Sequence, residues 1–300
     1  MSEKTNRFAG QSLGIRLLFI AVLGCCISLS TLEAVSATTP FPAKGPLRLL
    51  ESNPRYFTDG TGKAIYLTGL HIWNNLQDWN HEPSLEYTAY LRLLESYNHN
   101  FFRMWTWEHA AVPQPQGKWP NDPLPYERTG PGQDLSGLPK FDLTKLNQDY
   151  FDRLRSRVQE AGDRGIYVAV MLFQGFSIEG KGDRPNPWPG HPYNLNNNVN
   201  ALDGDLDHDG EGKEVHTLKS PAVTKIQEAY VRKVVDTLND LDNVLYEISN
   251  ESHRDSQDWQ YHIIRYIKQC EVGKPQQHPV VLTVEYPHAD QAALFSRPAD

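Results

Sequence analysis

The sequence predicts an α/β fold, a TIM-type (β/α)8 barrel of which about the first five βα units are present. Apolar, β-rich segments alternate with longer segments of helical period, as in a parallel sheet. The segments after strands are long, whereas the returns from helix to strand are short, which is typical of barrels that carry their active site on the loops after the strands. The expected strands are IYLTGLHIW (65–73), FFRMWTW (101–107), IYVAVMLF (166–173), VLYEISN (244–250) and PVVLTVEY (279–286).

Four amphipathic segments predict the helices that alternate with these strands. Ser84 and Ser256 stand at N-cap positions, and Gly165 stands where the second helix should end. A doubly wound sheet is the alternative architecture, but no glycine-rich phosphate loop follows any strand. The expected helices cover 84–97, 145–165, 222–240 and 256–270, and a hairpin is expected at 53–69.

The amino-terminal residues predict a secretory signal. Basic residues precede the apolar run LLFIAVLGCCISL, and a small-residue cleavage site ends at Ala37. The run is shorter than the ~20 apolar residues of a spanning helix, so no stable membrane insertion is expected after signal removal. Secreted or periplasmic localisation is expected, with a lipoprotein anchored through Cys25 as the alternative. The expected domains are a signal peptide (1–37), a linker (38–46) and the incomplete barrel (47–300).

Composition restricts the partners of the chain. Its 300 residues are 39% hydrophobic, which allows a core of good size. The formal net charge is −8 at pH 7, so nucleic acid and anionic membrane are not expected as partners. Cys270 would be the one cysteine left after signal removal, and no intramolecular disulfide is expected.

Two glutamates are expected to face the barrel interior from the fourth strand. Because alternate side chains share one face of a strand, Glu247, Ser249 and Glu251 should point the same way. Glu251 would emerge at the carboxyl end, where barrel enzymes bind substrates. Arg103 of the second strand can hold such carboxylates with paired hydrogen bonds. The alternatives are a purely structural pair of Arg103 with Glu247, and a Glu251 that only opens a surface loop.

Three motifs resemble those of a known enzyme group. YEISNE (246–251) and FFRMW (101–105) are similar to the fourth and second strands of clan A glycoside hydrolases, the retaining (β/α)8 enzymes that include cellulase-like families. YLTGLHIWNNLQDW (66–79) resembles the first strand and loop of bacterial cellulase-like members. The similarity extends over about residues 50–300.

The resemblance implies roles for individual residues. Glu251 would be the general acid/base, and Asn250 would hold the sugar 2-hydroxyl. Arg103 would brace the nucleophile, with Glu247 supporting it, and the aromatic residues that bind sugar would include His71 and Trp73. Retaining hydrolysis uses one carboxylic acid and one attacking carboxylate, and no cofactor is required.

The second carboxylate is expected to be missing. In the clan it ends the seventh strand, yet only five strands are expected before Asp300. Glu285 follows Glu251 by one helix and one strand, which assigns it to the fifth strand. These residues are therefore expected to be a fragment or an inactive remnant.

Tryptophans give a second signal of sugar binding. Trp73, Trp105 and Trp107 lie at or near strand ends, where flat rings can stack on sugar faces. Trp119 and Trp188 lie in the long loops and are expected at the surface or in a cleft. Core packing is the alternative for each ring.

An acidic loop predicts a structural calcium site. DGDLDHDGEGKEVH contains Asp205, Asp207 and Asp209 followed by Gly210, the first half of an EF-hand loop. His216 stands at position twelve, where a bidentate glutamate is usual. A solvated acidic loop is the alternative.

The expected function is that of an exported glycoside hydrolase that cleaves a β-linked poly- or oligosaccharide by double displacement. A non-catalytic carbohydrate-binding barrel is one alternative. The other is a metal-dependent amidohydrolase, which His71 and His109 suggest, although no H-E-x-x-H motif occurs.

Overall fold

A four-stranded parallel sheet forms the centre of the computed structural model, in the order β11-β10-β9-β4. All three pairings are parallel, and the order of the strands in the sheet is also their order along the chain. All eight residues of β9 are buried, as expected for an apolar strand that pairs on both sides. The strands are β4 (Phe101–Met104), β9 (Tyr167–Gln174), β10 (Val244–Asn250) and β11 (Val280–Val281).

The described residues all lie in the unit Thr39–Asp300. Several predicted features lie outside the described residues: the signal peptide with Cys25, the start of the linker, Glu285 and the side chain of Trp119. No helix among the described residues is both long and apolar enough to cross a membrane. The structure describes residues 41–79, 84–114, 117–182, 184–283 and 299–300.

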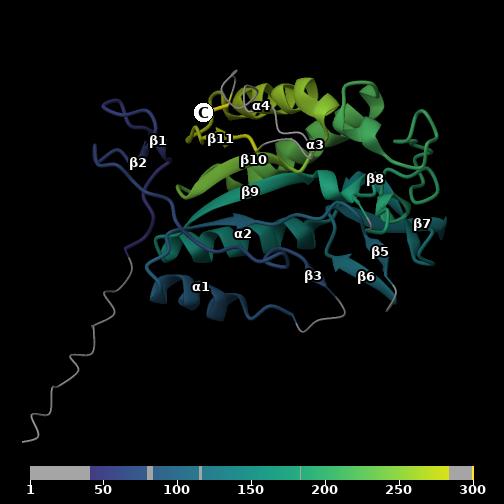
Figure 1. Cartoon of the computed structure of the whole chain (residues 1–300), viewed down its shortest axis with the longest axis horizontal. Coiled ribbons are helices and arrows are strands. Elements are labelled where there is room, and N and C mark those ends of the chain that lie inside the picture. Colours follow the sequence, from purple (N-terminus) through teal and green to yellow (C-terminus); the bar gives the residue numbers. More distant parts are fainter. Residues whose placement is uncertain (1–40, 80–83, 115–116, 183, 284–298) are drawn as a thin grey trace, which may run out of the picture. The chain divides into compact units, whose positions relative to one another are not determined.

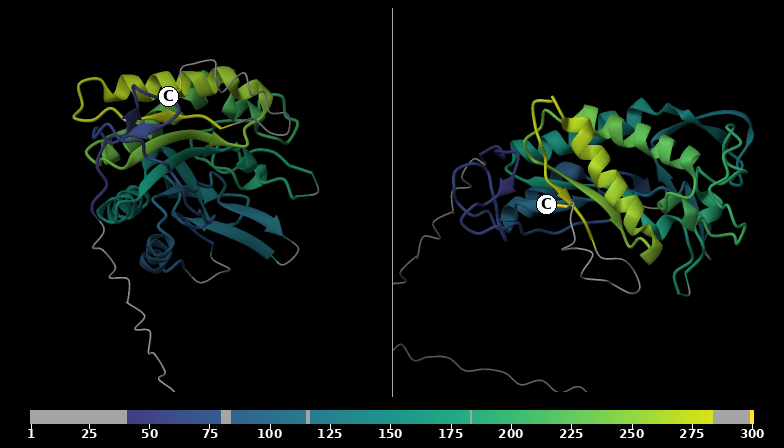
Figure 2. Two further views of the ribbon diagram at one scale, coloured as in Figure 1. Left: turned by 60° about the vertical axis from the view of Figure 1, so that its left-hand side comes forward. Right: turned by 90° about the horizontal axis from the view of Figure 1, so that it is seen from above.

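Four helices run alongside the strands (Figure 1 and Figure 2). Apolar residues recur at helical spacing, as Tyr87, Leu91 and Leu94 do in the first of them. Side chains from all four helices form one core with one face of the sheet, including Val170 and Tyr246. Strands added in one direction with helices on a shared face make a singly wound sheet, so the doubly wound alternative is wrong. The helices are α1 (Tyr87–Ser96), α2 (Gln148–Asp163), α3 (Pro221–Leu238) and α4 (Gln257–Glu271).

A closed (β/α)8 barrel is not confirmed, because the sheet of the described residues is open at β4 and β11. The segment expected as the first strand, 65–73, forms only a single bridge, at Ile65. It passes beside Asn100, whose side chain accepts from Thr68 N at 3.0 Å and donates to Tyr66 O at 3.1 Å. The backbone N–H of Asn100 also donates to Thr68 O at 3.0 Å. The backbone and side chain of one residue thus bind this segment where a full ladder was expected.

A small antiparallel pair covers the other face where the parallel strands begin. It consists of β1 (Arg48–Leu49) and β2 (Phe57–Thr58). Ile65 N donates to Phe57 O at 2.8 Å, and Asp59 accepts hydrogen bonds inside the turn, so the central part of the expected hairpin is present. Phe57 and Ile65 pack against the first residues of β9 and β10.

Both long segments after strands lie beyond the carboxyl ends of the sheet. In Figure 1 the hairpins β5–β6 and β7–β8 lie at the right, opposite β1 and β2. The sequence predicts an irregular loop there, since its glycines and prolines hide the alternation of strands. The elements are β3 (Asp78–Trp79), β5 (Ala111–Gln114), β6 (Gly117–Asp122), β7 (Tyr126–Gln133) and β8 (Pro139–Leu146), followed after β9 by the 3-10 turns η1 (Gly175–Ser177), η2 (Trp188–Gly190) and η3 (Lys213–His216).

One of the two expected N-cap residues is wrong. Ser84 lies ahead of α1, whose N-cap residue is Glu86. Ser256 is the N-cap residue of α4 as expected, although its hydroxyl donates to His253 O at 2.5 Å and accepts from the Gln260 side chain instead of from a backbone N–H. Gly165 does follow α2 with φ +77, a conformation that a residue without Cβ adopts without strain.

Candidate active site at the carboxyl end of the sheet

Arg103 joins β4 to β10 at the centre of the site. Its Nε donates a hydrogen bond to Glu247 Oε2 at 2.8 Å, and its Nη2 donates to Glu247 Oε1. Nη2 also donates to Asn250 Oδ1 at 2.9 Å. Burial raises the pKa of the Glu247 carboxyl, which is 1% exposed, while the hydrogen bonds from Arg103 lower it. This two-pronged contact fixes the direction of a buried carboxylate.

The strict alternation expected along β10 fails after Glu247. The ladder keeps one register, with Glu247 opposite Met171 and Ser249 opposite Phe173. Met171 packs on the site tryptophans, whereas Phe173 lies in the core shared with the helices, so the two pairs lie on opposite faces of the sheet. Ser249 therefore points toward the helices, where its Oγ lies 2.5 Å from Ser252 Oγ. The expectation that Ser249 shares the face of Glu247 is wrong.

Asn250 takes the place beside Arg103 that strict alternation assigns to Ser249. Its Nδ2 donates to Gln174 Oε1 at 3.0 Å, and its Oδ1 accepts from Arg103. Asn250 is 8% exposed. A side-chain amide has two N–H groups, so one of them remains for a ligand.

Glu251 follows β10 in the left-handed backbone conformation, with φ +51. A residue with a Cβ is strained there by about 1 kcal/mol, and such strain clusters at functional sites. Lys181 Nζ donates to the backbone oxygen of Glu251 at 2.6 Å. The carboxylate is partly exposed and makes no hydrogen bond or ion pair with the described residues. In contrast to Glu247, it is available to a ligand.

Aromatic rings continue the site from Arg103. The guanidinium carbon lies 5.0 Å from the centre of the Trp105 ring, which stacks on His71 with centroids 5.0 Å apart. The Trp73 ring lies 6.3 Å from Trp105, and Trp73 is 48% exposed. Trp107 Nε1 donates to Trp73 O at 2.8 Å. The four predicted aromatic residues thus lie together.

An open pocket of about 490 Å³ lies at this cluster. Trp105 and Trp107 are nearly buried and pack on Met171, so they support the pocket from below. Burial and the charge of Arg103 lower the pKa of His71, which keeps its ring neutral at pH 7. A pocket with flat apolar walls suits a ligand with apolar faces. Its lining residues are His71, Ile72, Trp73, Asn74 and Trp79.

Trp188 lies in the core and not in a cleft. It is 3% exposed and belongs to a second core cluster beside the hairpins. A Cβ on Gly212 would lie 2.1 Å from the Trp188 ring, which shows how closely the acidic loop packs on it. The expectation of a surface or cleft position is wrong for this residue.

Glu108 is a site residue that is not among the predicted ones. Its Oε1 accepts from Gln174 N at 2.5 Å and lies 3.0 Å from His216 Nε2. Its Oε2 lies 3.5 Å from His191 Nε2. Burial raises the pKa of Glu108, but His216 and His191 lower it to about 2. An acidic residue directly after a strand, in TWEHA, is the signal that could have identified it.

Two amide side chains were also missed. Asn75 accepts from Trp105 N at 2.6 Å and donates to Arg103 O at 2.8 Å. Gln77 accepts from Trp107 N at 2.6 Å and donates to Trp107 O at 3.0 Å. These two side chains form hydrogen bonds with the backbone after β4, as a neighbouring strand would. The hydrogen bonds hold the Trp105 and Trp107 rings in place.

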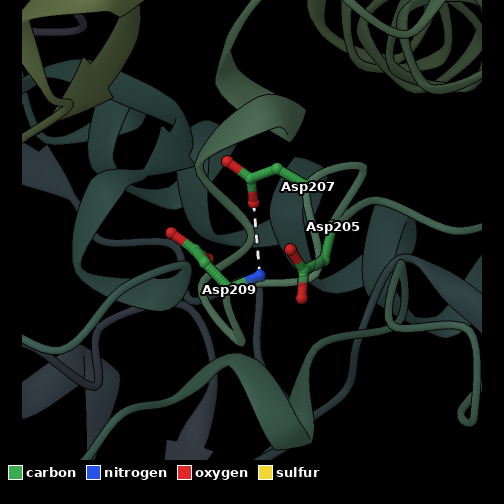
Figure 3. A group of neighbouring side chains, drawn as sticks. All are labelled: Asp205, Asp207 and Asp209. Carbon is green, nitrogen blue, oxygen red and sulfur yellow. Dashed lines mark hydrogen bonds between the residues drawn. The ribbon is translucent and has the colours of Figure 1, made fainter.

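The acidic residues of the loop lie together (Figure 3). Asp205, Asp207 and Asp209 each offer one oxygen, and these oxygens lie within 4.8 Å of one another. They are the one group of three or more potential metal-ligating side chains within the described part of the chain, and neither His71 nor His109 belongs to it. His109 Nδ1 lies 2.8 Å from Ser177 Oγ, and burial lowers its pKa to about 3.

The fold and the site define an α/β protein with a singly wound parallel sheet and a polar, aromatic-lined site at the carboxyl ends of its strands. The chain belongs to the family DUF6298, described as a domain of unknown function, whose model matches residues 114–293. No curated protein matches the sequence.

Solved structures with similarity to the chain include three glycoside hydrolases. A family 5 glycoside hydrolase from Bacteroides vulgatus ATCC 8482 is 14% identical, with TM-score 0.47, over 82% of this chain and 41% of its own. A family 5 mannosidase from Rhizomucor miehei is 15% identical, with TM-score 0.49, over 82% and 57%. An endo-β-1,4-mannanase from Thermotoga petrophila is 10% identical, with TM-score 0.36, over 64% and 37%. The chain spans less than two thirds of each, and similarity this low does not determine its activity.

Proposed function

We propose that this chain carries the acid/base half of a retaining glycoside hydrolase site, with Glu251 as the proton donor to the leaving oxygen. One observation carries the proposal. Glu251 directly follows a parallel strand in a strained left-handed conformation, and its carboxylate has no partner among the described residues. It comes directly after Asn250, which Arg103 holds in place. Retaining hydrolysis needs a carboxylic acid at such a position to protonate the leaving oxygen.

The neighbouring side chains fit a sugar ligand. Asn250 keeps one N–H for a hydroxyl group, since its other contacts go to Arg103 and Gln174. The exposed ring of Trp73 offers a flat apolar surface beside this polar group. A combination of stacking and directed hydrogen bonds is what a sugar ring, with apolar faces and hydroxyl edges, requires.

The attacking carboxylate of the proposed reaction is assigned to a residue outside those described. Glu247 has both oxygens engaged by Arg103, and Glu108 is held by Gln174 and His216. Neither carboxylate is free to attack an anomeric carbon. The assay should therefore use the natural gene product that contains this chain.

The test compares Glu251→Gln with Glu51→Gln, a matched change at an exposed position. Turnover of β-linked oligosaccharides is expected to fall by about 10² to 10⁴ in Glu251→Gln, because general acid catalysis contributes that much. Turnover of an aryl glycoside with a good leaving group should fall less, since that group needs no proton. Glu51→Gln should retain full activity.

Tryptophan fluorescence measures binding in the same variants. Glu251→Gln should bind oligosaccharide with nearly unchanged affinity, because the change preserves shape. Unchanged turnover in Glu251→Gln would refute the assignment. Parallel loss of binding and turnover would instead assign Glu251 to the structure of the site.

A further inference from the structure

We propose that the loop 205–214 binds one Ca²⁺ through the carboxylates of Asp205, Asp207, Asp209 and Glu214. The sequence predicts only the first half of a calcium loop, with His216 at the place of the closing glutamate. The structure assigns His216 elsewhere, since its Nε2 lies 3.0 Å from Glu108 Oε1.

The side chains of the three aspartates lie close to one another (Figure 3). Their nearest oxygens all lie within 4.8 Å of one another, the spacing of ligands that share an ion. Asp205 Oδ2 accepts from Gly210 N at 3.0 Å, which orients the first carboxylate of the loop. Asp207 and Asp209 are exposed, so an ion can reach the cluster from solvent.

Two buried oxygens without partners point to a ligand. Asp205 is 9% exposed, and its Oδ1 has no hydrogen-bond partner among the described residues. Glu214 is 5% exposed, and its Oε2 likewise has none. A buried carboxylate oxygen without a donor is costly, and a bound cation removes that cost.

Glu214 follows the three aspartates in the same loop, outside the group of oxygens that lie within 4.8 Å of one another. In the proposed site it is the ligand that closes on the ion. Lys219 Nζ lies 3.7 Å from Glu214 Oε1 and leaves Oε2 free. Glu214 thus brings a fourth carboxylate, two residues ahead of the position where an EF-hand loop has its closing glutamate.

The ligand chemistry favours calcium. All four side chains offer hard oxygen donors, with no histidine or cysteine that would favour zinc. Ca²⁺ accepts irregular sets of six to eight oxygens, whereas Mg²⁺ demands a near-ideal octahedron. A loop that offers several carboxylate oxygens without an octahedral arrangement suits the larger ion.

The loop leads directly into the candidate active site. Lys213 O lies 2.9 Å from His253 Nε2, two residues after Glu251. His216, at the end of η3, contacts Glu108. A cation that fixes the loop would therefore also stabilise these contacts.

The experiment is a calorimetric titration of the chain with Ca²⁺ after removal of bound metal with a chelator. One Ca²⁺ per chain is expected, and the melting temperature should rise with Ca²⁺ concentration. Asp207→Asn and Glu214→Gln should each weaken binding by at least about tenfold, because each removes a charged ligand. Asp163→Asn, at an exposed position in α2, is the control and should bind as the unchanged chain does.

Three outcomes would overturn the proposal. They are an absence of heat and of thermal shift at millimolar Ca²⁺, an equal response to Mg²⁺, and unchanged binding in Asp207→Asn. Normal Ca²⁺ affinity in Glu214→Gln alone would refute the fourth ligand. Urea unfolding without metal checks that each variant folds.

Discussion

At the scale of single residues, two glutamates of one strand meet opposite environments. Glu247 is buried and held by Arg103, whereas Glu251 is partly exposed and has no partner among the described side chains. Environments that differ in this way give two carboxyl groups different roles. Glu247 is held by Arg103, and the proposed function assigns the role of proton donor to Glu251.

Arg103→Met is expected to lower the free energy of unfolding by about 2–4 kcal/mol at pH 7, because it leaves Glu247 buried and unpaired. The loss should grow with pH. Without Arg103 the folded-state pKa of Glu247 rises further above its unfolded value of about 4.3, so stability is kept below that pH and is lost as the pH rises through the folded pKa. Urea unfolding at pH 4, 6 and 8 measures this.

The double variant Arg103→Met with Glu247→Gln is the control for that prediction. It removes the unpaired charge and should recover part of the stability at pH 8. A loss that is the same at all three pH values, or that the second change does not relieve, would contradict the charge argument.

At the scale of elements, a break in the side-chain alternation of β9 and β10 determines the site. Ser249, opposite Phe173, faces the helices, and Asn250 reaches Arg103. The turn after β10 then packs closely on η1, where Gly175 leaves room for the backbone of Glu251. The position of Glu251 depends on this close approach.

Gly175→Ala tests the close approach. The added Cβ would lie 2.3 Å from Glu251 O and 2.6 Å from Ser252 Cα, so the turn must move. A loss of about 1–3 kcal/mol in unfolding free energy is expected, together with lower turnover. Gly180→Ala is the matched control, because its Cβ would meet only ordinary contacts at 3.7 Å or more. Equal effects of the two changes would show that the approach to Glu251 does not matter.

At the scale of the whole molecule, different core clusters support the sheet and the segments after its strands. The main core joins all four helices to the sheet, and another lies under the hairpins and the acidic loop. The site lies at the junction of these regions, with Glu108 between β9 and η3. Ordered segments after the strands, and not the sheet alone, therefore shape the site.

Hydrogen exchange should follow this architecture. The amides of β9 and β10 are buried and paired within the sheet, so they should exchange most slowly, by global unfolding. The amides of β1 and β2 belong to a two-residue pair and should exchange first. Mass spectrometry of peptides from a time course measures both. Fast exchange in β9 under native conditions would contradict the arrangement.

Much of the fold and part of the site could be predicted from periodicity. The apolar runs predict β4, β9 and β10, and helical spacing predicts four helices near their observed positions. The first strand was not predicted correctly, because hydrogen bonds made by Asn100, two of them through its side chain, bind this segment where a ladder was expected. Hydrogen bonding by a single side chain leaves no mark in a hydrophobic pattern.

The sequence by itself determined the parallel α/β plan, the pairing partners Arg103 and Glu247, and the acidic loop, because each follows from residue type and local spacing. Only the tertiary structure decided that Asn250 lies beside Arg103 and that Glu108 joins His216. The physical reason is the sequence separation of the contacts. Local patterns specify which face of an element is apolar, whereas a break in side-chain alternation and contacts between distant segments depend on how the packed elements meet.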